Sequence, residues 1–120
     1  MKNIVILEDN IMMALVLRII ISSLGLSYSH FTTPSQAIKE EDFDKVKLII
    51  TDFKMLSENV LKLLEYLKKQ HLKIPIIIYS NNQDAKKKIE KAGYKKLISE
   101  YLPKTINSTI IKENIIKYIN

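Results

Sequence analysis

The feature that most constrains the fold of this chain is the regular alternation of short apolar runs with longer amphipathic segments. Strands are predicted for the apolar runs, at residues 3–7, 26–31, 47–51, 74–79 and a short run that ends near Leu102. Helices are predicted for the segments between and after them, at residues 10–24, 34–41, 57–70, 82–92 and 107–119. Continuous apolar strands separated by helices require a parallel sheet that is covered on both faces. The pattern therefore predicts a doubly wound α/β fold with three layers.

Composition restricts the domain organisation and the kinds of site. The 120 residues are 47% hydrophobic and 27% charged, which is typical of one globular domain. Two glycines and the absence of cysteine exclude a glycine-rich nucleotide loop, a disulfide framework and a thiolate zinc site. We expect residues 1–120 to form this single domain, with no effector domain.

The net charge of +6 leaves nucleic acid, an anionic membrane and an acidic protein open as partners. Arg18 is the only arginine, whereas nucleic-acid readers rely on arginine for bidentate contacts. The apolar segment 11–26 contains Arg18 and is too short for a comfortable membrane span. The apolar run 4–7 is too short for a secretion signal. We therefore expect a cytoplasmic protein that binds neither nucleic acid nor membrane directly.

Charged and hydroxyl side chains follow four of the five predicted strands. Glu8 and Asp9 follow the first strand, Asp52 the third, Ser80 the fourth and Lys104 the fifth. In doubly wound folds the functional site lies beyond these carboxyl ends. Clustered carboxylates repel one another, and Mg²⁺, which takes oxygen ligands and meets phosphate, would relieve that repulsion. Asp52 is then a candidate nucleophile toward phosphorus, with Lys104 and Ser80 contacting the phosphoryl oxygens.

Each of these residues also has an ordinary interpretation. Asp9 or Asn10 can cap the following helix, and Asp52 can begin a turn. A lone serine is uninformative, and a lysine near the end of a chain is usually solvated. The coincidence of all of them at successive strand ends favours the functional interpretation.

Four segments match a known family, namely IVILEDN (4–10), LIITDFKM (48–55), IPIIIYSNN (74–82) and EYLPK (100–104). Through them the whole chain resembles the receiver domain of two-component response regulators. The resemblance implies a flavodoxin-like, five-stranded parallel sheet of order 2-1-3-4-5 with five helices. Two helices are expected on one face of the sheet and three on the other.

The resemblance also implies roles for individual residues. Asp52 is expected to accept a phosphoryl group from a histidine kinase or a histidine phosphotransfer protein. Asp9, Asp52 and the backbone carbonyl of Lys54 are expected to bind Mg²⁺, with Glu8 binding it directly or through water. The protein is then not an enzyme in the usual sense, beyond weak self-catalysed phosphoryl transfer and dephosphorylation.

Ser80 and Tyr101 resemble the switch pair of the family, in which the hydroxyl moves to the phosphoryl group while the ring turns inward. The leading hypothesis is a stand-alone receiver that acts as a signalling switch or phosphorelay intermediate. One alternative is a receiver-like interaction module that works without phosphorylation. Another, an aspartate-nucleophile phosphatase, normally needs a D-x-D pair after the first strand, which residues 8–10 do not supply.

The chain departs from the family pattern in three places. Leu56 and Val60 stand where the loop after the phosphoacceptor usually has proline and glycine. Thr105, and not proline, follows Lys104, so a cis peptide bond there would cost about 3 kcal/mol. The segment 93–101 is longer than usual.

The first predicted helix carries more apolar residues than the fold requires. Met12, Leu15 and Ile19 form a stripe opposite the arc that faces the sheet. An aligned apolar stripe is a candidate interface, and receivers that resemble this chain present that helix to their phosphodonor. The open alternatives are a homodimer and a cover by a neighbouring loop or helix. We expect a monomer or a weak homodimer.

Lysines dominate the fourth predicted helix. Lys87 and Lys91 belong to a basic cluster that is a candidate surface for an acidic output protein. The other lysines of the cluster, on this helix and the segment after it, are Lys86, Lys88, Lys95 and Lys96. Ala85, Ile89 and Ala92 are expected to turn inward. A solvated lysine face with no partner is an equally good interpretation of this helix.

Overall fold

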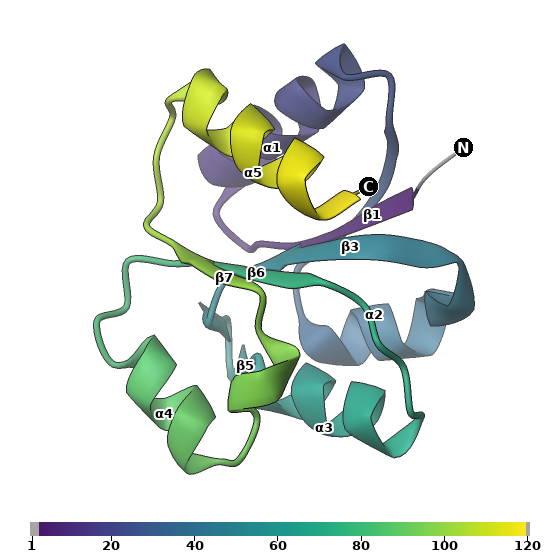
Figure 1. The fold of residues 1–120 in the computed structure, drawn as a ribbon, viewed down its shortest axis with the longest axis vertical. Helices are drawn as coiled ribbons and strands as arrows, with labels where there is room; N and C mark the ends of the chain where they lie inside the picture. The colour runs from purple at the N-terminus through teal and green to yellow at the C-terminus, as the bar shows by residue number, and fades with distance from the viewer. Residues whose placement is uncertain (1–2, 120) are drawn as a thin grey trace.

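A five-stranded parallel sheet forms the middle layer of the computed structural model, which describes residues 3–119 (Figure 1). Its strands are β1 (Asn3–Leu7), β2 (Ser27–Phe31), β3 (Val46–Thr51), β6 (Ile76–Tyr79) and β7 (Glu100–Leu102). They lie in the order β2-β1-β3-β6-β7, and every neighbouring pair is parallel. The predicted doubly wound sheet, with its first, third and fourth strands in the centre, is confirmed.

Five α-helices cover the sheet, as predicted (Figure 1). One face carries α1 (Ile11–Ser23) and α5 (Ser108–Ile119), and the other carries α2 (Pro34–Glu40), α3 (Leu61–Lys69) and α4 (Ala85–Lys91). Short 3-10 helices, η1 (Phe43–Lys45) and η2 (Lys95–Leu97), precede β3 and β7. Within residues 3–119 no helix is long and apolar enough to cross a membrane.

The central strands contribute side chains to two separate cores, because successive side chains of a strand point to opposite faces. Val5 and Leu7 of β1 pack in the core beneath α2, α3 and α4. Ile4 and Ile6 pack in the core beneath α1 and α5. All four side chains are completely buried. This burial on both faces explains why the run of apolar residues in the sequence is continuous and does not alternate.

The segment between β3 and α3 differs from the prediction. The helix expected from residue 57 begins at Leu61. Residues 54–59 instead form an antiparallel hairpin of β4 (Lys54–Met55) and β5 (Glu58–Asn59). Two contacts explain the late start: the Met55 side chain is fully buried in the core, and Asn59 Oδ1 accepts the N–H of Leu61 at 2.9 Å.

The fourth helix is also shorter than predicted. The N–H of Asp84 donates to Asn82 Oδ1 at 2.9 Å, so a turn precedes the helix, which begins at Ala85. Ala85 and Ile89 are buried, as expected. The expectation that Ala92 turns inward is wrong, because Ala92 is the C-cap of α4 and is exposed.

Three helices end in a residue with left-handed backbone conformation. Gly25 (φ 73°) follows α1 and Gly93 (φ 90°) follows α4, whereas the end of α3 uses His71 (φ 55°). There the N–H of Leu72 donates to the carbonyl of Leu67 at 3.0 Å, which is the long hydrogen bond of a Schellman motif. Glycine adopts this conformation without the clash that a Cβ introduces. His71 therefore adds backbone strain that the two glycines avoid.

Replacement of His71 by glycine is expected to stabilise the fold. The exposed imidazole contributes little packing, while removal of its Cβ relieves about 1 kcal/mol of left-handed strain. The free energy of unfolding, measured in urea, should rise by about that amount. Gly93→Ala is the matched control, because a Cβ there has no atom within 4 Å and only the backbone effect remains. It should lower stability, and a loss of stability in His71→Gly would contradict the assignment of strain.

Candidate functional site

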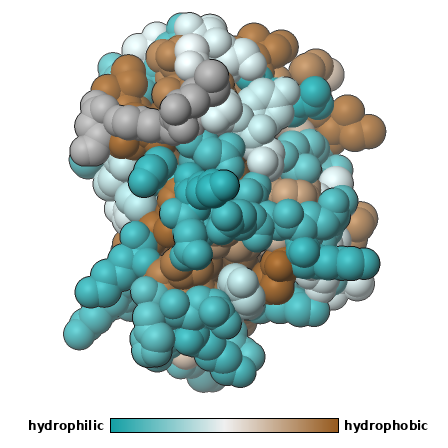
Figure 2. Space-filling view, turned by 90° about the vertical axis from the view of Figure 1, so that its right-hand side faces the viewer, coloured by the Kyte–Doolittle hydropathy of each residue, from teal (hydrophilic) through white to brown (hydrophobic). Residues whose placement is uncertain are grey.

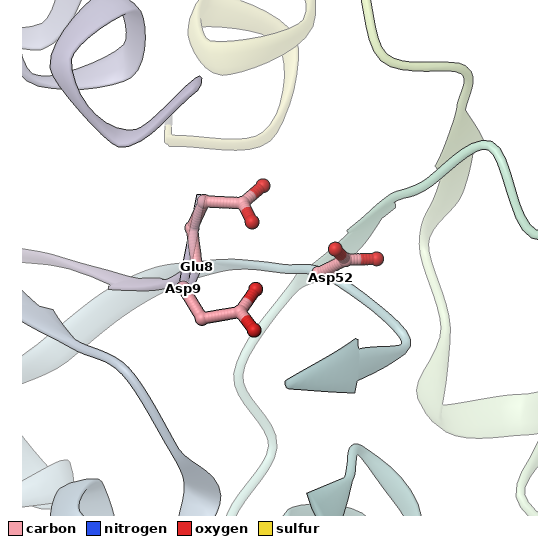
Figure 3. Close-up of side chains that lie close together, drawn as sticks. All are labelled: Glu8, Asp9 and Asp52. Atoms are coloured by element: carbon pink, nitrogen blue, oxygen red, sulfur yellow. The ribbon is translucent and has the colours of Figure 1, made fainter. Parts of the chain in front are cut away.

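Three carboxylates meet where β1 and β3 end (Figure 3). Glu8 and Asp9 follow β1 directly and Asp52 follows β3, and one carboxylate oxygen from each lies within 4.8 Å of the others. The parallel register produces this arrangement, since Leu7 is paired with Thr51, so that the next residues emerge side by side. The structure thus brings together the three carboxylates that the sequence predicted at this edge.

Lys104 neutralises part of this negative charge. Its Nζ lies 2.8 Å from Glu8 Oε1 and 2.8 Å from Asp52 Oδ2. Burial raises the pKa of Glu8, whose side chain is 1% exposed, and the hydrogen bond from Lys104 opposes that rise. Burial disfavours the Lys104 ammonium, but its hydrogen bonds to Asp52 and Glu8 outweigh burial and raise its pKa. One ammonium among three carboxylates leaves net negative charge, which suits a divalent cation with oxygen ligands.

Asp9 and Asp52 are further fixed by backbone N–H groups. Phe53 N–H donates to Asp52 Oδ1 at 2.6 Å, and Leu56 N–H donates to Asp9 Oδ2 at 2.9 Å. Leu56 lies in the turn of the β4–β5 hairpin with a φ of 54°. A proline at this position would have no N–H to donate. The departure from the family pattern at Leu56 therefore adds a hydrogen bond to the site.

A hollow of about 300 Å³ opens beside Asp52. Its lining residues are Asp52, Lys54, Ser80, Asn81, Asn82 and Lys104. Ser80 thus borders the same hollow as Asp52, as predicted, and its Oγ accepts the N–H of Asn82 at 3.0 Å. Asn81 had not been selected from the sequence, yet its Oδ1 accepts the backbone N–H of Lys104 at 2.9 Å. This bond ties the end of β6 to the residue that carries the ammonium.

Tyr79 is a second residue that the sequence analysis placed only in a strand. Its hydroxyl donates to the Thr105 carbonyl at 2.6 Å and accepts the Thr105 N–H at 3.3 Å. It therefore holds the backbone directly after Lys104, where residues 3–119 contain no cis peptide bond. The sequence did offer a signal, because Tyr79 ends an apolar run and a buried tyrosine hydroxyl needs a hydrogen-bond partner.

Tyr101 lies outside the hollow that contains Asp52. Its ring packs against the core beneath α2, α3 and α4, and its hydroxyl is buried without a hydrogen-bond partner among the residues described. Burial raises the pKa of this hydroxyl, and the charge of Glu90 raises it further. A small hollow of about 130 Å³ is bordered by both Tyr101 and Ser80. Ser80 therefore borders the hollow of Asp52 and that of Tyr101.

A sequence model of the response regulator receiver domain matches residues 4–116. The chain belongs to this family. Receiver domains are phosphoacceptor signalling modules of two-component systems and not classical enzymes, in agreement with the prediction. They bind Mg²⁺ at an acidic pocket, and the cluster of Glu8, Asp9 and Asp52 is consistent with such a pocket.

Solved structures of other receiver domains share this fold. The non-phosphorylated HemR receiver domain from Leptospira biflexa has a TM-score of 0.86 at 17% identity, covering 100% of this chain and 95% of that one. A receiver domain protein from Clostridium thermocellum has a TM-score of 0.83 at 20% identity, covering 100% of this chain and 95% of that one. The response regulator TrrA from Thermotoga maritima was solved in complex with Mg²⁺-BeF. It has a TM-score of 0.80 at 20% identity, covering 98% of this chain and 99% of that one. A search of curated protein sequences gave no match.

The stripe on α1 of this receiver is exposed, as predicted. Met12, Leu15 and Ile19 are 64%, 42% and 59% exposed, while Leu17 and Ile21 on the opposite side are buried. No described loop or helix covers the stripe, so the alternative of a cover within residues 3–119 is excluded. The three side chains are available to a partner.

The lysines of α4 fall into two groups. Lys86 and Lys88 have their ammonium groups 5.6 Å from the ring centroids of Tyr101 and Phe53, respectively. Lys87 and Lys91 are exposed and make no such ring contact in the described structure. All four lysines of α4 are exposed, and Lys87 and Lys91 differ from the other two in having no ring of residues 3–119 beneath the ammonium group.

Replacement of Tyr79 by phenylalanine is expected to destabilise the receiver. The Thr105 carbonyl loses its buried partner, which costs about 1–3 kcal/mol of unfolding free energy. Burial raises the pKa of Tyr79 above its ordinary value of 10.0. The folded protein therefore keeps the phenolic proton that the unfolded chain releases, and the stability of the unsubstituted protein should fall as the pH rises above that value.

Urea unfolding at neutral pH and at pH values above 10 tests both effects. Tyr79→Phe should be less stable at neutral pH and should lose part of the alkaline decline. Tyr28→Phe is the control, because the Tyr28 hydroxyl accepts a hydrogen bond from the partly exposed Arg18. An alkaline decline that is unchanged in Tyr79→Phe would contradict the assignment.

Proposed function

We propose that this receiver accepts a phosphoryl group on Asp52 from a histidine kinase or a histidine phosphotransfer protein. The observation that carries the proposal is the position of Asp52 beside Glu8 and Asp9, with Lys104 Nζ 2.8 Å from its Oδ2. The Lys104 side chain is only 17% exposed, so its ammonium is held in the site. An aspartate that merely began a turn would not require such a buried cation beside it. The chain then serves as a stand-alone switch or as an intermediate in a phosphorelay.

The proposed metal ligands are Asp9, Asp52 and the backbone carbonyl of Lys54, with Glu8 binding directly or through water. The excess of carboxylates over ammonium groups in the cluster supports this set. Mg²⁺, when bound, supplies positive charge that neutralises phosphoryl oxygens. The raised pKa of the buried Glu8 points the same way, because a nearby cation would stabilise its carboxylate.

The transfer itself needs little more than position and charge. A carboxylate oxygen of Asp52 forms a bond to phosphorus while the bond between phosphorus and the donor histidine nitrogen breaks, and the nitrogen keeps the electron pair. The Lys104 ammonium is placed to pair with a phosphoryl oxygen. The Ser80 hydroxyl, which borders the same hollow, is placed to donate a hydrogen bond to another.

Ser80 and Tyr101 are the proposed switch pair. Their shared hollow supports this pairing, because movement of the Ser80 hydroxyl toward Asp52 changes the space beside the ring. The Tyr101 hydroxyl is already turned inward and buried. That arrangement also favours the second candidate function, an interaction module that keeps its conformation without phosphorylation.

Replacement of Asp52 by asparagine is expected to abolish phosphorylation. The unsubstituted protein, incubated with acetyl phosphate and Mg²⁺, should gain one acid-labile phosphoryl group by intact mass spectrometry. Of the two carboxylates that contact Lys104, Asp52 is the one that lines the hollow, whereas Glu8 is buried beside it. Asp52→Asn should gain none, and Asp44→Asn, a change of an exposed aspartate, should behave like the unsubstituted protein.

Removal of Mg²⁺ with a chelator should stop the labelling, and Asp9→Asn should raise the Mg²⁺ concentration that labelling needs. Labelling that persists in Asp52→Asn would contradict the phosphoacceptor assignment. A folded protein that is never labelled, at any Mg²⁺ concentration, would favour the interaction module.

We also propose partner surfaces for this function. Met12, Leu15 and Ile19 form the site for the histidine-bearing donor, or for a second copy of the chain when no donor is present. Lys87 and Lys91 form part of the surface for an acidic output protein. The proposal places the protein in the cytoplasm as a single domain, a monomer or weak dimer, without direct binding to nucleic acid or membrane.

Leu15→Glu is expected to slow phosphotransfer from a protein donor, because it puts a charge in the centre of an apolar contact. Labelling of Asp52 by acetyl phosphate should stay nearly unchanged, since Leu15 does not line the hollow beside Asp52. Transfer from a panel of purified histidine phosphotransfer proteins measures the first rate. Ile116→Glu, at a similarly exposed isoleucine on α5, is the matched control. Equal loss with both donors would show that Leu15 is structural.

A further inference from the structure

A second, more apolar hollow lies at the opposite end of the sheet from Asp52, where β6 begins. Its volume is about 500 Å³, within the range of about 300–1,000 Å³ that small-molecule sites occupy. Its lining residues are Leu67, Leu72, Lys73, Ile74, Pro75, Ile76, Lys96, Leu97 and Ser99. Figure 2 views this side of the molecule and shows brown side chains in a recess of the lower half, bordered by teal ones.

Two backbone features build the walls of this hollow. The Schellman motif at the end of α3 brings Leu72 back against Leu67, the apolar contact that accompanies such motifs. On the other side η2, in the segment that is longer than usual for the family, supplies Leu97. Ser99 anchors that segment to β6, since its N–H donates to the Ile76 carbonyl at 2.9 Å and its Oγ accepts the Ile76 N–H at 3.3 Å. The hollow is therefore held by hydrogen bonds on both sides.

The charges at the hollow all have one sign. Lys73 and Lys96 are its only charged lining residues, and both are exposed. Neither ammonium has an ion-pair partner among residues 3–119. Lys68 lies nearby on α3, with its ammonium 5.6 Å from the ring centroid of Tyr94. An anion at the rim would thus meet two unpaired cations and no carboxylate of the lining.

We infer that this hollow binds a small anionic amphiphile, with an apolar body against Leu67, Leu72 and Leu97 and a carboxylate at Lys73 and Lys96. The apolar walls favour a hydrocarbon body, which leaves water on binding. The two lysines favour a negative head group and give it a fixed direction. Inorganic phosphate fits less well, because the walls offer it hydrocarbon and not a cradle of N–H donors.

Decanoate is a suitable probe, and decanol is its uncharged counterpart of equal chain length. Both are titrated, below the concentration at which decanoate forms micelles, into the uniformly ¹⁵N-labelled protein. We expect saturable shifts of the amide signals of Leu72, Lys73 and Leu97, and none at the α1 stripe. Decanol should bind about tenfold more weakly, because it lacks the charge that the lysines attract.

The double variant Lys73→Glu/Lys96→Glu should weaken decanoate binding about tenfold and leave decanol binding nearly unchanged. Its matched control is Lys39→Glu/Lys87→Glu, which changes the net charge equally at exposed lysines outside the hollow. Asp52→Asn should bind decanoate like the unsubstituted protein. The decanoate test therefore gives the same result whether or not Asp52 accepts a phosphoryl group. Equal affinity for decanol and decanoate, equal loss in both double variants, or shifts centred on α1 would each overturn the inference.

Discussion

The ammonium of Lys104 is the cation, among residues 3–119, that pairs with the carboxylates that two strands bring to one edge of the sheet. Its Nζ is 2.8 Å from both Glu8 and Asp52, and Glu8 is almost completely buried. A buried carboxylate without a partner is strongly destabilising. The ends of β1, β3 and β7 are therefore coupled electrostatically as well as through the sheet. The same contact places a positive charge where an incoming phosphoryl group needs one.

Two positions where the family has proline have instead become hydrogen-bond donors. Leu56 gives its N–H to Asp9, and Thr105 gives its N–H to the hydroxyl of Tyr79. Proline would fix the backbone through its ring and offer no N–H. In this chain the loops on either side of the site are fixed by hydrogen bonds to side chains of β6 and of the residues after β1. The geometry of the site is thus reached by a different set of restraints.

The parallel sheet and most of the site were predictable from the pattern, because buried strands produce continuous apolar runs and the residues after them must meet at one edge. The order of the strands was predicted only through the resemblance to the receiver family. Glu8, Asp9, Asp52, Ser80 and Lys104 followed from the pattern alone. The β4–β5 hairpin did not, because strands of two residues are too short to show a period. The partners of Tyr79 and Asn81 were equally hidden, since each is more than twenty residues away along the chain. The left-handed backbone at His71 was not predicted either, because glycine is the residue that usually marks such a helix end.

Strand β6 begins at the apolar hollow, with Ile76, and is followed by Ser80 at the phosphoacceptor hollow. Four residues of extended chain, roughly 13 Å, are all that separates these two surfaces. Ladders on both sides, to β3 and to β7, hold the strand in register, and a slip by one residue would turn every side chain to the wrong face. Insertions and deletions can accumulate in the loops at either end, but the length of β6 cannot drift. The distance between the apolar hollow and the phosphoacceptor hollow therefore stays constant even when the loops at one end of β6 change.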